Sequence, residues 1–398
     1  MKIVVIGGGP SGLYFALLAK NHFPAADIRV FEQNPEGATY GFGIVLADRG
    51  LNRFADAHRP SYDAIMAASF VSRNRIISHP DEAFFVPGGG YGGAISRLRL
   101  LEILESFCRD AGIPIRHEAR IDGVDSGADL AAGADLVVAA DGVNSAVRRS
   151  REHEFGTTTY HLTNRLAWYG TTRHFPYPLL SFIRHPTGHF VGAAYAYTER
   201  MSTFVAECDA ETWTRSGLDR MSENEARQFT ESVFSRELQG HPLIGNNSAW
   251  RQLPVTRNRA WSADHVVLIG DALHSAHPTI GSGTRIAMED SIALADALVQ
   301  CNGRVPETLA AFRQRREPQK AKLVDASERS SAWYEDFAKK MQELPPAEFV
   351  FDFLMRTGRL SRRRLMAEYP EFMNQYAHRV AWPSPDDSVP ARTLVGEP

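Results

Sequence analysis

The chain has 398 residues, of which 43% are hydrophobic and 23% are charged, so it is long enough for two or three globular domains and does not have the composition of a disordered protein. Its formal net charge of -3 provides no basic excess for nucleic acid or for an anionic membrane. Three widely spaced cysteines argue against a disulfide framework, a redox Cys-x-x-Cys pair and a zinc site. We therefore expect a cytoplasmic protein without a bound metal.

The amino-terminal segment is apolar, but it does not resemble a membrane anchor. Three glycines and Pro10 interrupt the apolar run within the first ten residues. No stretch of about eighteen consecutive apolar residues occurs elsewhere in the chain. The sequence thus predicts neither a signal peptide nor a transmembrane helix.

Strands and helices alternate at the amino terminus, which predicts a parallel sheet. A β-branched strand at residues 2–6, a helix at 13–20 and a strand at 28–32 form one βαβ unit. Two further buried strands are expected at 135–140 and 265–269. Between these two, short aromatic and β-branched segments at 166–171, 182–184, 189–197 and 202–207 predict an antiparallel sheet. Helices are expected at 97–110, 223–238, 286–299 and 306–342.

A glycine-rich turn follows the first strand in the pattern G-x-G-x-x-G. The turn comprises Gly7, Gly9, Pro10, Ser11 and Gly12, and it opens the first helix. In this context the glycines allow a tight turn, close approach of a pyrophosphate and close packing of helix on strand. Glu32 ends the second strand, where a carboxylate can accept the hydroxyls of an adenosine ribose. The motif therefore predicts a site for FAD or NAD and does not separate the two.

Two later segments place a carboxylate at the end of a buried strand. Asp141 and Gly142 follow the strand at 135–140, whereas Gly270 and Asp271 follow the strand at 265–269. The second pair leads into a loop that opens a helix near Thr284. The loop residues that we expect to contact a cofactor are Pro278, Gly281, Ser282, Gly283 and Thr284. Backbone N–H groups at such a helix start can bind the carbonyl oxygens of a flavin.

Together the three segments resemble the class A flavoprotein aromatic monooxygenases, the family of p-hydroxybenzoate hydroxylase. The resemblance covers roughly residues 1–375, and it also includes Arg97 at the head of a helix, where the family has a flavin-contacting arginine. Segments 40–46, 168–171, 201–208 and 280–284 resemble the branch of salicylyl-CoA 5-hydroxylase and 2-aminobenzoyl-CoA monooxygenase most closely.

The resemblance implies an α/β fold in which a Rossmann-like FAD-binding domain is interleaved with an antiparallel-sheet substrate domain. The expected FAD-binding parts are 1–75, 96–160 and 255–304, and the expected substrate-domain parts are 76–95 and 161–254. A helical extension at 305–380 and a flexible tail at 381–398 complete the chain.

The resemblance also implies an activity: tightly bound FAD takes a hydride from NADH or NADPH, reacts with O2, and hydroxylates an aromatic ring through a C4a-hydroperoxyflavin. An aryl-CoA thioester such as salicylyl-CoA or 2-aminobenzoyl-CoA is the favoured substrate. Arg49, Arg53, Arg73 and Arg75 are the cations that could bind its phosphates. A homodimer is compatible with the sequence.

Several other functions remain open. They are hydroxylation of a free or carrier-bound aromatic or indole compound, a flavin-dependent halogenase, an FAD- or NAD-dependent oxidase or reductase, and an FAD-binding protein without catalysis. The halogenase motif W-x-W-x-I-P is absent from the sequence.

Candidate catalytic residues are those that could remove a proton from a ring hydroxyl. They are His277, which precedes the loop proline, and Tyr195 and Tyr197 on one expected strand. Aromatic side chains that could line the substrate pocket are Phe42, Trp168, Phe190 and Phe204.

Overall fold

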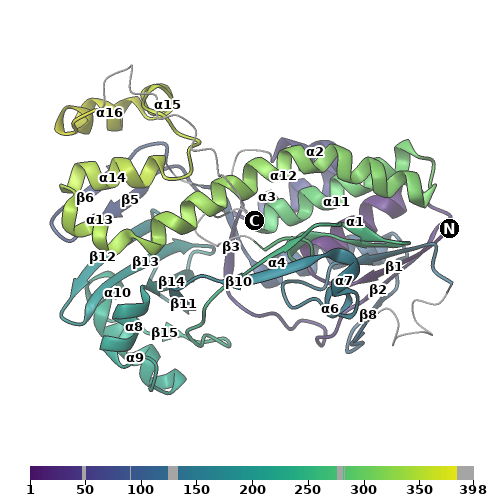
Figure 1. Cartoon of the computed structure of the whole chain (residues 1–398), viewed down its shortest axis with the longest axis horizontal. Coiled ribbons are helices and arrows are strands. Elements are labelled where there is room, and N and C mark those ends of the chain that lie inside the picture. Colours follow the sequence, from purple (N-terminus) through teal and green to yellow (C-terminus); the bar gives the residue numbers. More distant parts are fainter. Residues whose placement is uncertain (47–50, 90, 124–132, 276–280, 282, 383–398) are drawn as a thin grey trace.

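The computed structural model describes residues 1–46, 51–89, 91–123, 133–275, 281 and 283–382. Two sheets form the two ends of the molecule, and the long helix α12 (Val305–Glu335) extends from one to the other (Figure 1). Between the sheets lie β3 (Gly43–Leu46) and a two-stranded ribbon of β10 (Thr157–His161) and β16 (Pro254–Asn258).

The amino-terminal strand lies inside a six-stranded sheet, as its β-branched sequence predicts. The strand order is β17 (Ser262–Ala263), β18 (Val266–Leu268), β9 (Leu136–Ala139), β1 (Lys2–Ile6), β2 (Asp27–Phe31) and β8 (Ile115–Arg116), and all neighbours except β17 and β18 are parallel. The adjacent strands β18, β9 and β1 are almost completely buried, as expected for the interior of a parallel sheet. Two short helices on one side are α6 (Ala146–Ser150) and α7 (Glu152–Phe155).

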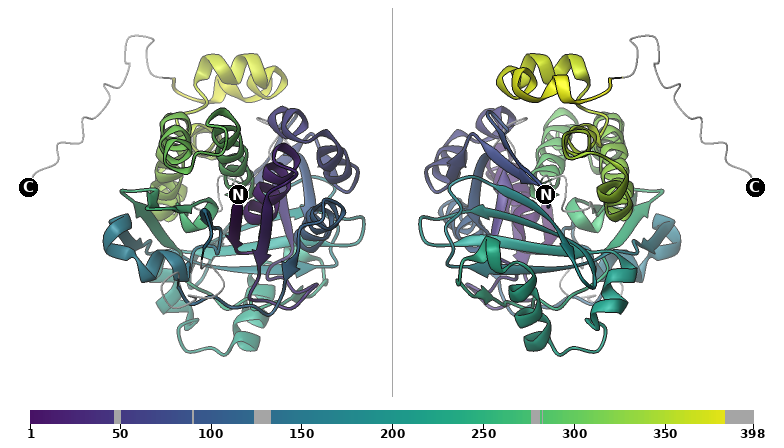
Figure 2. Two further views of the ribbon diagram at one scale, coloured as in Figure 1. Left: turned by 90° about the vertical axis from the view of Figure 1, so that its right-hand side faces the viewer. Right: turned by 90° about the vertical axis from the view of Figure 1, so that its left-hand side faces the viewer.

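The other face of the parallel sheet carries the helices that follow the expected nucleotide-binding turns. They are α1 (Pro10–His22), α4 (Arg97–Asp110) and α11 (Gly283–Gln300), and α1 packs against the other two. The helix predicted at 97–110 is confirmed at those residues. Figure 2 shows α11 and α12, in green, on the same side of the sheet.

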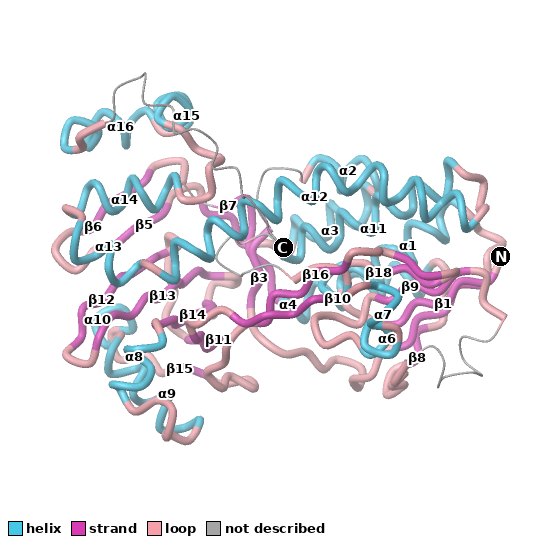
Figure 3. The backbone as a smooth tube through the Cα atoms, viewed as in Figure 1, coloured by secondary structure: helices cyan, strands magenta, loops and turns pink. Residues whose placement is uncertain are grey.

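The second sheet has seven strands, all antiparallel to their neighbours except β12 and β5, and it makes the second lobe (Figure 3). We call it the antiparallel sheet. Their order is β15 (Leu243–Ile244), β11 (Arg165–Thr171), β14 (Ser202–Cys208), β13 (Gly188–Ala196), β12 (Leu179–His185), β5 (Arg75–Ser78) and β6 (Ala83–Val86). One face is covered by α8 (Ala210–Ser216), α9 (Glu223–Val233) and α10 (Ser235–Leu238), so the helix predicted at 223–238 is two helices.

A third sheet was not predicted from the sequence. It consists of β3, β7 (Tyr91–Ser96) and β4 (Phe70–Ser72), with α2 (Asn52–Ala57) and α3 (Arg59–Ala67) between β3 and β4 in the chain. These strands are short and contain several glycines, which weakens the period-two pattern that identifies a strand.

The carboxy-terminal region is helical, as the sequence predicts. The expected helix at 306–342 divides at Asp336 into α12 and α13 (Phe337–Glu343), and α14 (Pro346–Met355), α15 (Arg362–Glu368) and α16 (Pro370–Tyr376) follow. Phe182 of β12 packs edge-on against Phe349 of α14 with ring centroids 4.7 Å apart. These helices therefore cover the end of the antiparallel sheet opposite to β3 (Figure 1).

No helix among the described residues is long and apolar enough to cross a membrane. In the same part of the chain, no group of three or more histidine, cysteine or acidic side chains could hold a metal ion. All three cysteines are buried and free.

Candidate active site

Four residues predicted from the sequence to bind a cofactor lie at one edge of the parallel sheet. Gly7, Glu32, Asp141 and Asp271 come just after β1, β2, β9 and β18, and these strands are parallel neighbours. The carboxyl ends of parallel strands lie at the same edge, which is where open α/β sheets bind ligands. The fold thus gathers segments that are up to 264 residues apart in sequence into one site.

The glycine-rich turn has the geometry that the motif predicts. Gly7 has a φ of +109°, and a Cβ at this position would lie 2.3 Å from the carbonyl oxygen of Ala140. A Cβ on Gly12 would lie only 2.0 Å from the carbonyl oxygen of Gly7, so helix α1 could not pack on its strand with a larger residue. By contrast, a Cβ on Gly9 would meet no atom within 4 Å. Gly9 therefore faces open space at the amino terminus of α1, where backbone N–H groups attract an anion.

Pro10 and Ser11 begin the first turn of α1, and the Ser11 side chain points away from this open space. Its hydroxyl donates to the carbonyl oxygen of Ala287 at 3.0 Å, and Ser291 Oγ donates to the Ser11 carbonyl at 2.7 Å. The side chain thus joins α1 to α11. Only the backbone of Ser11 faces the amino terminus of the helix, a division of roles that the motif could not reveal.

Glu32 is held in place by backbone and side-chain donors. Its Oε2 atom accepts from Gly8 N at 2.7 Å, and Oε1 accepts from Asn34 N at 2.8 Å and Asn34 Nδ2 at 2.7 Å. The side chain is half-buried beside the glycine-rich turn. This is the position in which a carboxylate can accept from ribose hydroxyls.

Arg97 and Asp271 come together between the two lobes. Asp271 is accessible to solvent, yet burial of its carboxyl raises its pKa, and the positive charge of Arg97 opposes that rise. Burial likewise lowers the pKa of Arg97, while Asp271 and Glu32 act to raise it. We refer to the surroundings of these two accessible yet desolvated side chains as the recess. Arg97 Nε donates to Thr39 Oγ1 at 3.1 Å, and this contact fixes the guanidinium at the recess.

Asp141 caps a short helix and keeps one oxygen available. Its Oδ2 accepts from Ala146 N at 2.8 Å and from Val147 N at 3.2 Å. Its Oδ1 is buried and accepts no hydrogen bond from the part of the chain that the structure describes. Desolvation raises the pKa of this carboxyl. A buried acceptor without a donor is costly, so Oδ1 is suited to a ligand hydroxyl or N–H group. Gly142 follows with a φ of +78°.

The second glycine turn is described only in part. Gly270 has a φ of +61° and its N–H donates to Asp290, whereas Gly281 has a φ of +57°. Gly283 and Thr284 begin α11, and a Cβ on Gly283 would meet no atom within 4 Å. His277, Pro278 and Ser282 lie outside the described residues.

On the face of the antiparallel sheet turned toward β3, other elements cover two rows of residues, and we call the less covered strip between these rows the groove. Its floor is a row of four residues that pair directly across four neighbouring strands: Trp168, Val205, Ala193 and Leu180. All four side chains are half-buried, although β14 and β13 are central strands. Residues two positions away along each strand are buried. The face is therefore open along one row only.

The strand β3 covers the row on one side of this floor. That row is Gly170, Thr203 and Tyr195. The Tyr195 hydroxyl donates to the carbonyl oxygen of Gly43 at 2.8 Å, and Gly43 N donates to Thr203 Oγ1 at 2.9 Å. A Cβ on Gly170 would lie 2.4 Å from the ring of Phe42, so Phe42 lies directly over this glycine. The next residue after β13, Tyr197, packs in the same way on Gly43, and burial raises its pKa.

The helices α12 to α14 cover the row on the other side. That row is Leu166, Glu207, Val191 and Phe182. Glu207 is only 3% exposed, accepts from Asn164 Nδ2 at 2.9 Å, and has a pKa raised to about 8 by burial. Sequence analysis missed Glu207. The alternation of β14 does place it on the same face as Thr203, but its burial depends on α12, more than 100 residues later.

The four predicted pocket aromatics divide between the two faces of the sheet. Phe42 and Trp168 lie on the groove face, and the indole Nε1 of Trp168 is buried without a partner in the structure. Phe190 and Phe204 are each 1% exposed and pack with Phe234 on the opposite face. The structure therefore places these two in the core below α9 and α10 rather than in the groove, because strand alternation turns them away.

The sheet edge and the groove are adjacent, because Arg97 N donates to the carbonyl oxygen of Phe42 at 2.8 Å. The family model for the FAD binding domain matches residues 115–327. Salicyloyl-CoA 5-hydroxylase from Streptomyces sp is 36% identical over 387 residues, which covers 91% of this chain and 72% of the relative. The chain belongs to the FAD-dependent monooxygenases.

Two further similarities agree with this assignment. The 3-hydroxy-4-methyl-anthranilyl-(aryl-carrier protein) 5-monooxygenase of Streptosporangium sibiricum is 32% identical over 373 residues and covers 92% of this chain and 97% of its own length. A solved mutant of 2-methyl-3-hydroxypyridine-5-carboxylic acid oxygenase superposes with a TM-score of 0.69 at 20% identity, over 92% of this chain and 96% of that one. The latter shows that the fold is shared.

The residues at the sheet edge fit the FAD of this family. The open space at Gly9 and the amino terminus of α1 suit the pyrophosphate, and Glu32 suits the adenosine ribose. Asp271 and Arg97 lie in the recess that leads to Phe42 and the groove. The free Oδ1 of Asp141 offers an acceptor at the same edge. A monooxygenase needs its cofactor next to its substrate, and this arrangement supplies that proximity.

Proposed function

We propose that this monooxygenase uses NAD(P)H and O2 to hydroxylate an aromatic ring whose carboxyl group is a thioester, on CoA or on a carrier protein. FAD supplies the redox chemistry: reduced by NAD(P)H, it activates O2 so that one oxygen atom reaches the ring. The protein must then position the ring, exclude water and keep the recess closed to competing reactions. The observation that carries the proposal is the uncharged groove.

The spacing of the two covered rows can admit an aromatic ring. The two covered rows are four residues apart along each strand, which corresponds to about 13 Å between backbones. The floor presents an indole, two branched aliphatic side chains and one methyl group, from Trp168, Val205, Leu180 and Ala193. A flat apolar floor with Phe42 at its edge suits a planar ring and disfavours water.

The charges around the groove favour a neutral carboxyl derivative over a free acid. None of the residues in the floor row and the two flanking rows is a lysine, arginine or histidine. The only acid among them, Glu207, has its pKa raised to about 8 by burial. A free carboxylate on this floor would be desolvated with no cation from these three rows to compensate it, which costs several kcal/mol. A thioester avoids that cost. The salicyloyl-CoA and carrier-bound anthranilyl substrates in the names of the two relatives support the same chemistry.

Two of the arginines expected to bind CoA phosphates, Arg53 and Arg75, do not share one site, and Arg49 lies outside the described residues. Arg53 lies on α2 and its NH1 donates to Gln319 at 2.9 Å, whereas the Nε of Arg75 on β5 donates to the carbonyl oxygen of Gly89. Helix α2 and strand β5 belong to different lobes (Figure 1). The proposal therefore rests on the thioester, which CoA and a carrier protein share.

The role of Tyr195 in this proposal is to hold β3 in place at the side of the groove. Its hydroxyl proton is donated to Gly43, so Tyr195 fixes β3 and, through it, Phe42. Tyr197 packs its ring on the same glycine. We assign neither tyrosine as a base. His277 remains a candidate base that lies outside the described residues.

Matched substrate pairs test the proposal. The holoenzyme is supplied with NADH or NADPH, and salicylyl-CoA is compared with salicylate and 2-aminobenzoyl-CoA with 2-aminobenzoate. The N-acetylcysteamine thioesters of the same acids, which lack the nucleotide, separate the effect of a neutral carboxyl from the effect of CoA phosphates. We expect thioesters to stimulate cofactor consumption with a KM at least ~10-fold below that of the free acids, because one uncompensated buried charge costs more than 1.4 kcal/mol. Equal stimulation by a free acid would contradict the proposal.

A further inference from the structure

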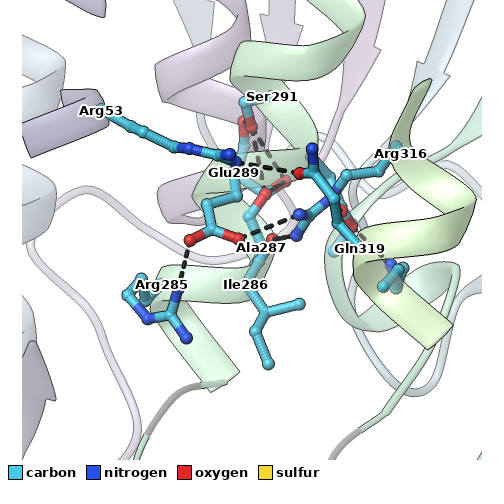
Figure 4. Close-up of polar contacts among 12 residues, drawn as sticks. Arg53, Arg285, Ile286, Ala287, Glu289, Ser291, Arg316 and Gln319 are labelled. Atoms are coloured by element: carbon cyan, nitrogen blue, oxygen red, sulfur yellow. Dashed lines mark hydrogen bonds and ion pairs between the residues drawn. The ribbon is translucent and has the colours of Figure 1, made fainter. Parts of the chain in front are cut away.

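A cluster of five charged side chains is buried between α11 and α12. Glu289 Oε2 and Arg316 NH1 are 2.9 Å apart, and Arg285 pairs with Oε1 of the same carboxylate (Figure 4). Asp290 Oδ1 accepts from Arg316 Nε at 2.7 Å, and Asp290 Oδ2 accepts from Lys320 Nζ at 2.6 Å. All five side chains are at most 7% exposed. Buried charges at this density are rare unless each one is paired.

The cluster is hydrogen-bonded to the turn at Gly270 and Asp271, the second glycine turn of the FAD site. Asp290 Oδ2 also accepts from Gly270 N at 3.1 Å, and Gly270 precedes Asp271. The Lys320 and Arg316 charges hold the pKa of Asp290 below its usual value, so the carboxylate stays ionised behind the turn. Lys320 also lies over the ring of Trp261, with its Nζ atom 5.5 Å from the centroid. The position of this lysine is therefore fixed from two sides.

The cluster carries one positive charge in excess. Within the cluster, Arg285, Arg316 and Lys320 face the carboxylates of Glu289 and Asp290. The charge of Asp271, outside the cluster, also acts on Lys320. The charge of Lys320 also acts on the recess: burial raises the pKa of Asp271 and Lys320 opposes that rise, whereas burial together with Lys320 lowers the pKa of His274 to about 3. The groups that act on Asp271 from the elements around it are Arg97 of α4, Asp290 of α11 and Lys320 of α12.

From this geometry we infer that Lys320 is a positioning residue of the FAD site, which acts through Asp290 and the Gly270–Asp271 turn to make the site more favourable for reduced, negatively charged flavin. A buried cation stabilises the reduced cofactor relative to the oxidised one, because the interior screens its field weakly. The inference rests on FAD binding by the family fold and not on the identity of the substrate.

Two substitutions of opposite charge test the inference. The midpoint potential of bound FAD is measured by dye equilibration in the wild type, Lys320→Met, Asp290→Asn and the exposed control Lys322→Met. Lys320→Met should disfavour reduced FAD on the order of tenfold, the size expected for one buried charge at short range, which for a two-electron couple is a shift of about 30 mV to more negative potential. Asp290→Asn removes a negative charge and should shift the potential in the positive direction. The control should match the wild type.

The opposite signs separate this role from simple damage to the fold. Damage to the α11–α12 packing would move both potentials in the same direction, and that result overturns the inference. An unchanged potential in Lys320→Met with FAD bound also overturns it, because the lysine would then carry no charge that the flavin senses. If one variant fails to retain FAD, the sign of the potential shift in the other variant still tests the inference. Restoration of the wild-type potential in Lys320→Arg supports the inference. None of these readouts requires the aromatic substrate.

Discussion

Replacing Glu207 by glutamine should make the protein less sensitive to high pH. Burial raises the pKa of Glu207 from its usual 4.5 to about 8. Each pKa unit corresponds to about 1.4 kcal/mol, so ionising this carboxyl costs about 5 kcal/mol more in the folded protein than in the unfolded chain. Its contribution to stability is fully present below pH 4.5, declines as the pH rises, and is lost once the pH passes about 8.

Glutamine resembles the protonated acid, because its amide oxygen can still accept from Asn164 Nδ2 while it carries no charge. We expect Glu207→Gln and the wild type to melt at similar temperatures at pH 5. At pH 8.5 the variant should melt about 5–10 °C higher, given roughly 1–2 °C per kcal/mol in a chain of this length. Thermal melting of the holoprotein across this pH range measures the difference. Glu211→Gln, at an exposed position on α8, serves as the control and should follow the wild type. Parallel wild-type and Glu207→Gln curves at every pH would refute the reasoning.

Three further substitutions test the cofactor site and the groove. Gly12→Ala places a Cβ 2.0 Å from a backbone oxygen and should lower the free energy of unfolding by about 3 kcal/mol or more, measured by thermal unfolding. Gly9→Ala, whose Cβ meets no atom within 4 Å, should fold normally and lose FAD affinity in a fluorescence titration. Equal stability of the two variants would contradict this. Asp271→Ala should lower the 450 nm flavin absorbance of purified protein several-fold, while the exposed Asp325→Ala should retain it, and equal occupancy would remove Asp271 from the site. Ala193→Phe fills the floor row and should raise the KM for the aryl thioester at least ~10-fold with FAD content unchanged; an unchanged KM would show that the ring binds elsewhere.

The cofactor edge could be predicted from sequence because its signals are local. A glycine spacing, a strand and an acid identify the turn at Gly7 to Gly12 without knowledge of the rest of the chain. Roles that depend on distant contacts could not be predicted. Ser11 reads as a cofactor residue in the motif, yet its side chain bonds to Ala287, 276 residues later. One carboxylate oxygen of Asp141 likewise accepts a hydrogen bond from the first residue of α6.

The groove was predicted only in outline, because strand register decides which side chains share a face. Phe204 and Val205 are neighbours in sequence, but only Val205 pairs into the floor row beside Trp168. The size of Phe204 favours it as a pocket residue from sequence alone, whereas nothing in the sequence marks Ala193, whose small side chain leaves the groove open. The cover supplied by β3 was also missed, since a four-residue strand next to glycines carries little periodic signal.

The central claim is that this chain inserts oxygen from O2 into an aryl thioester. The most direct measurement is mass analysis of the product formed by the holoenzyme from NAD(P)H, ¹⁸O₂ and salicylyl-CoA or 2-aminobenzoyl-CoA. The account predicts thioester-stimulated cofactor consumption and a product that gains a single ¹⁸O atom on the ring. Consumption that is never stimulated by a thioester, or a product without the label, would contradict the claim and favour an oxidase that does not transfer oxygen.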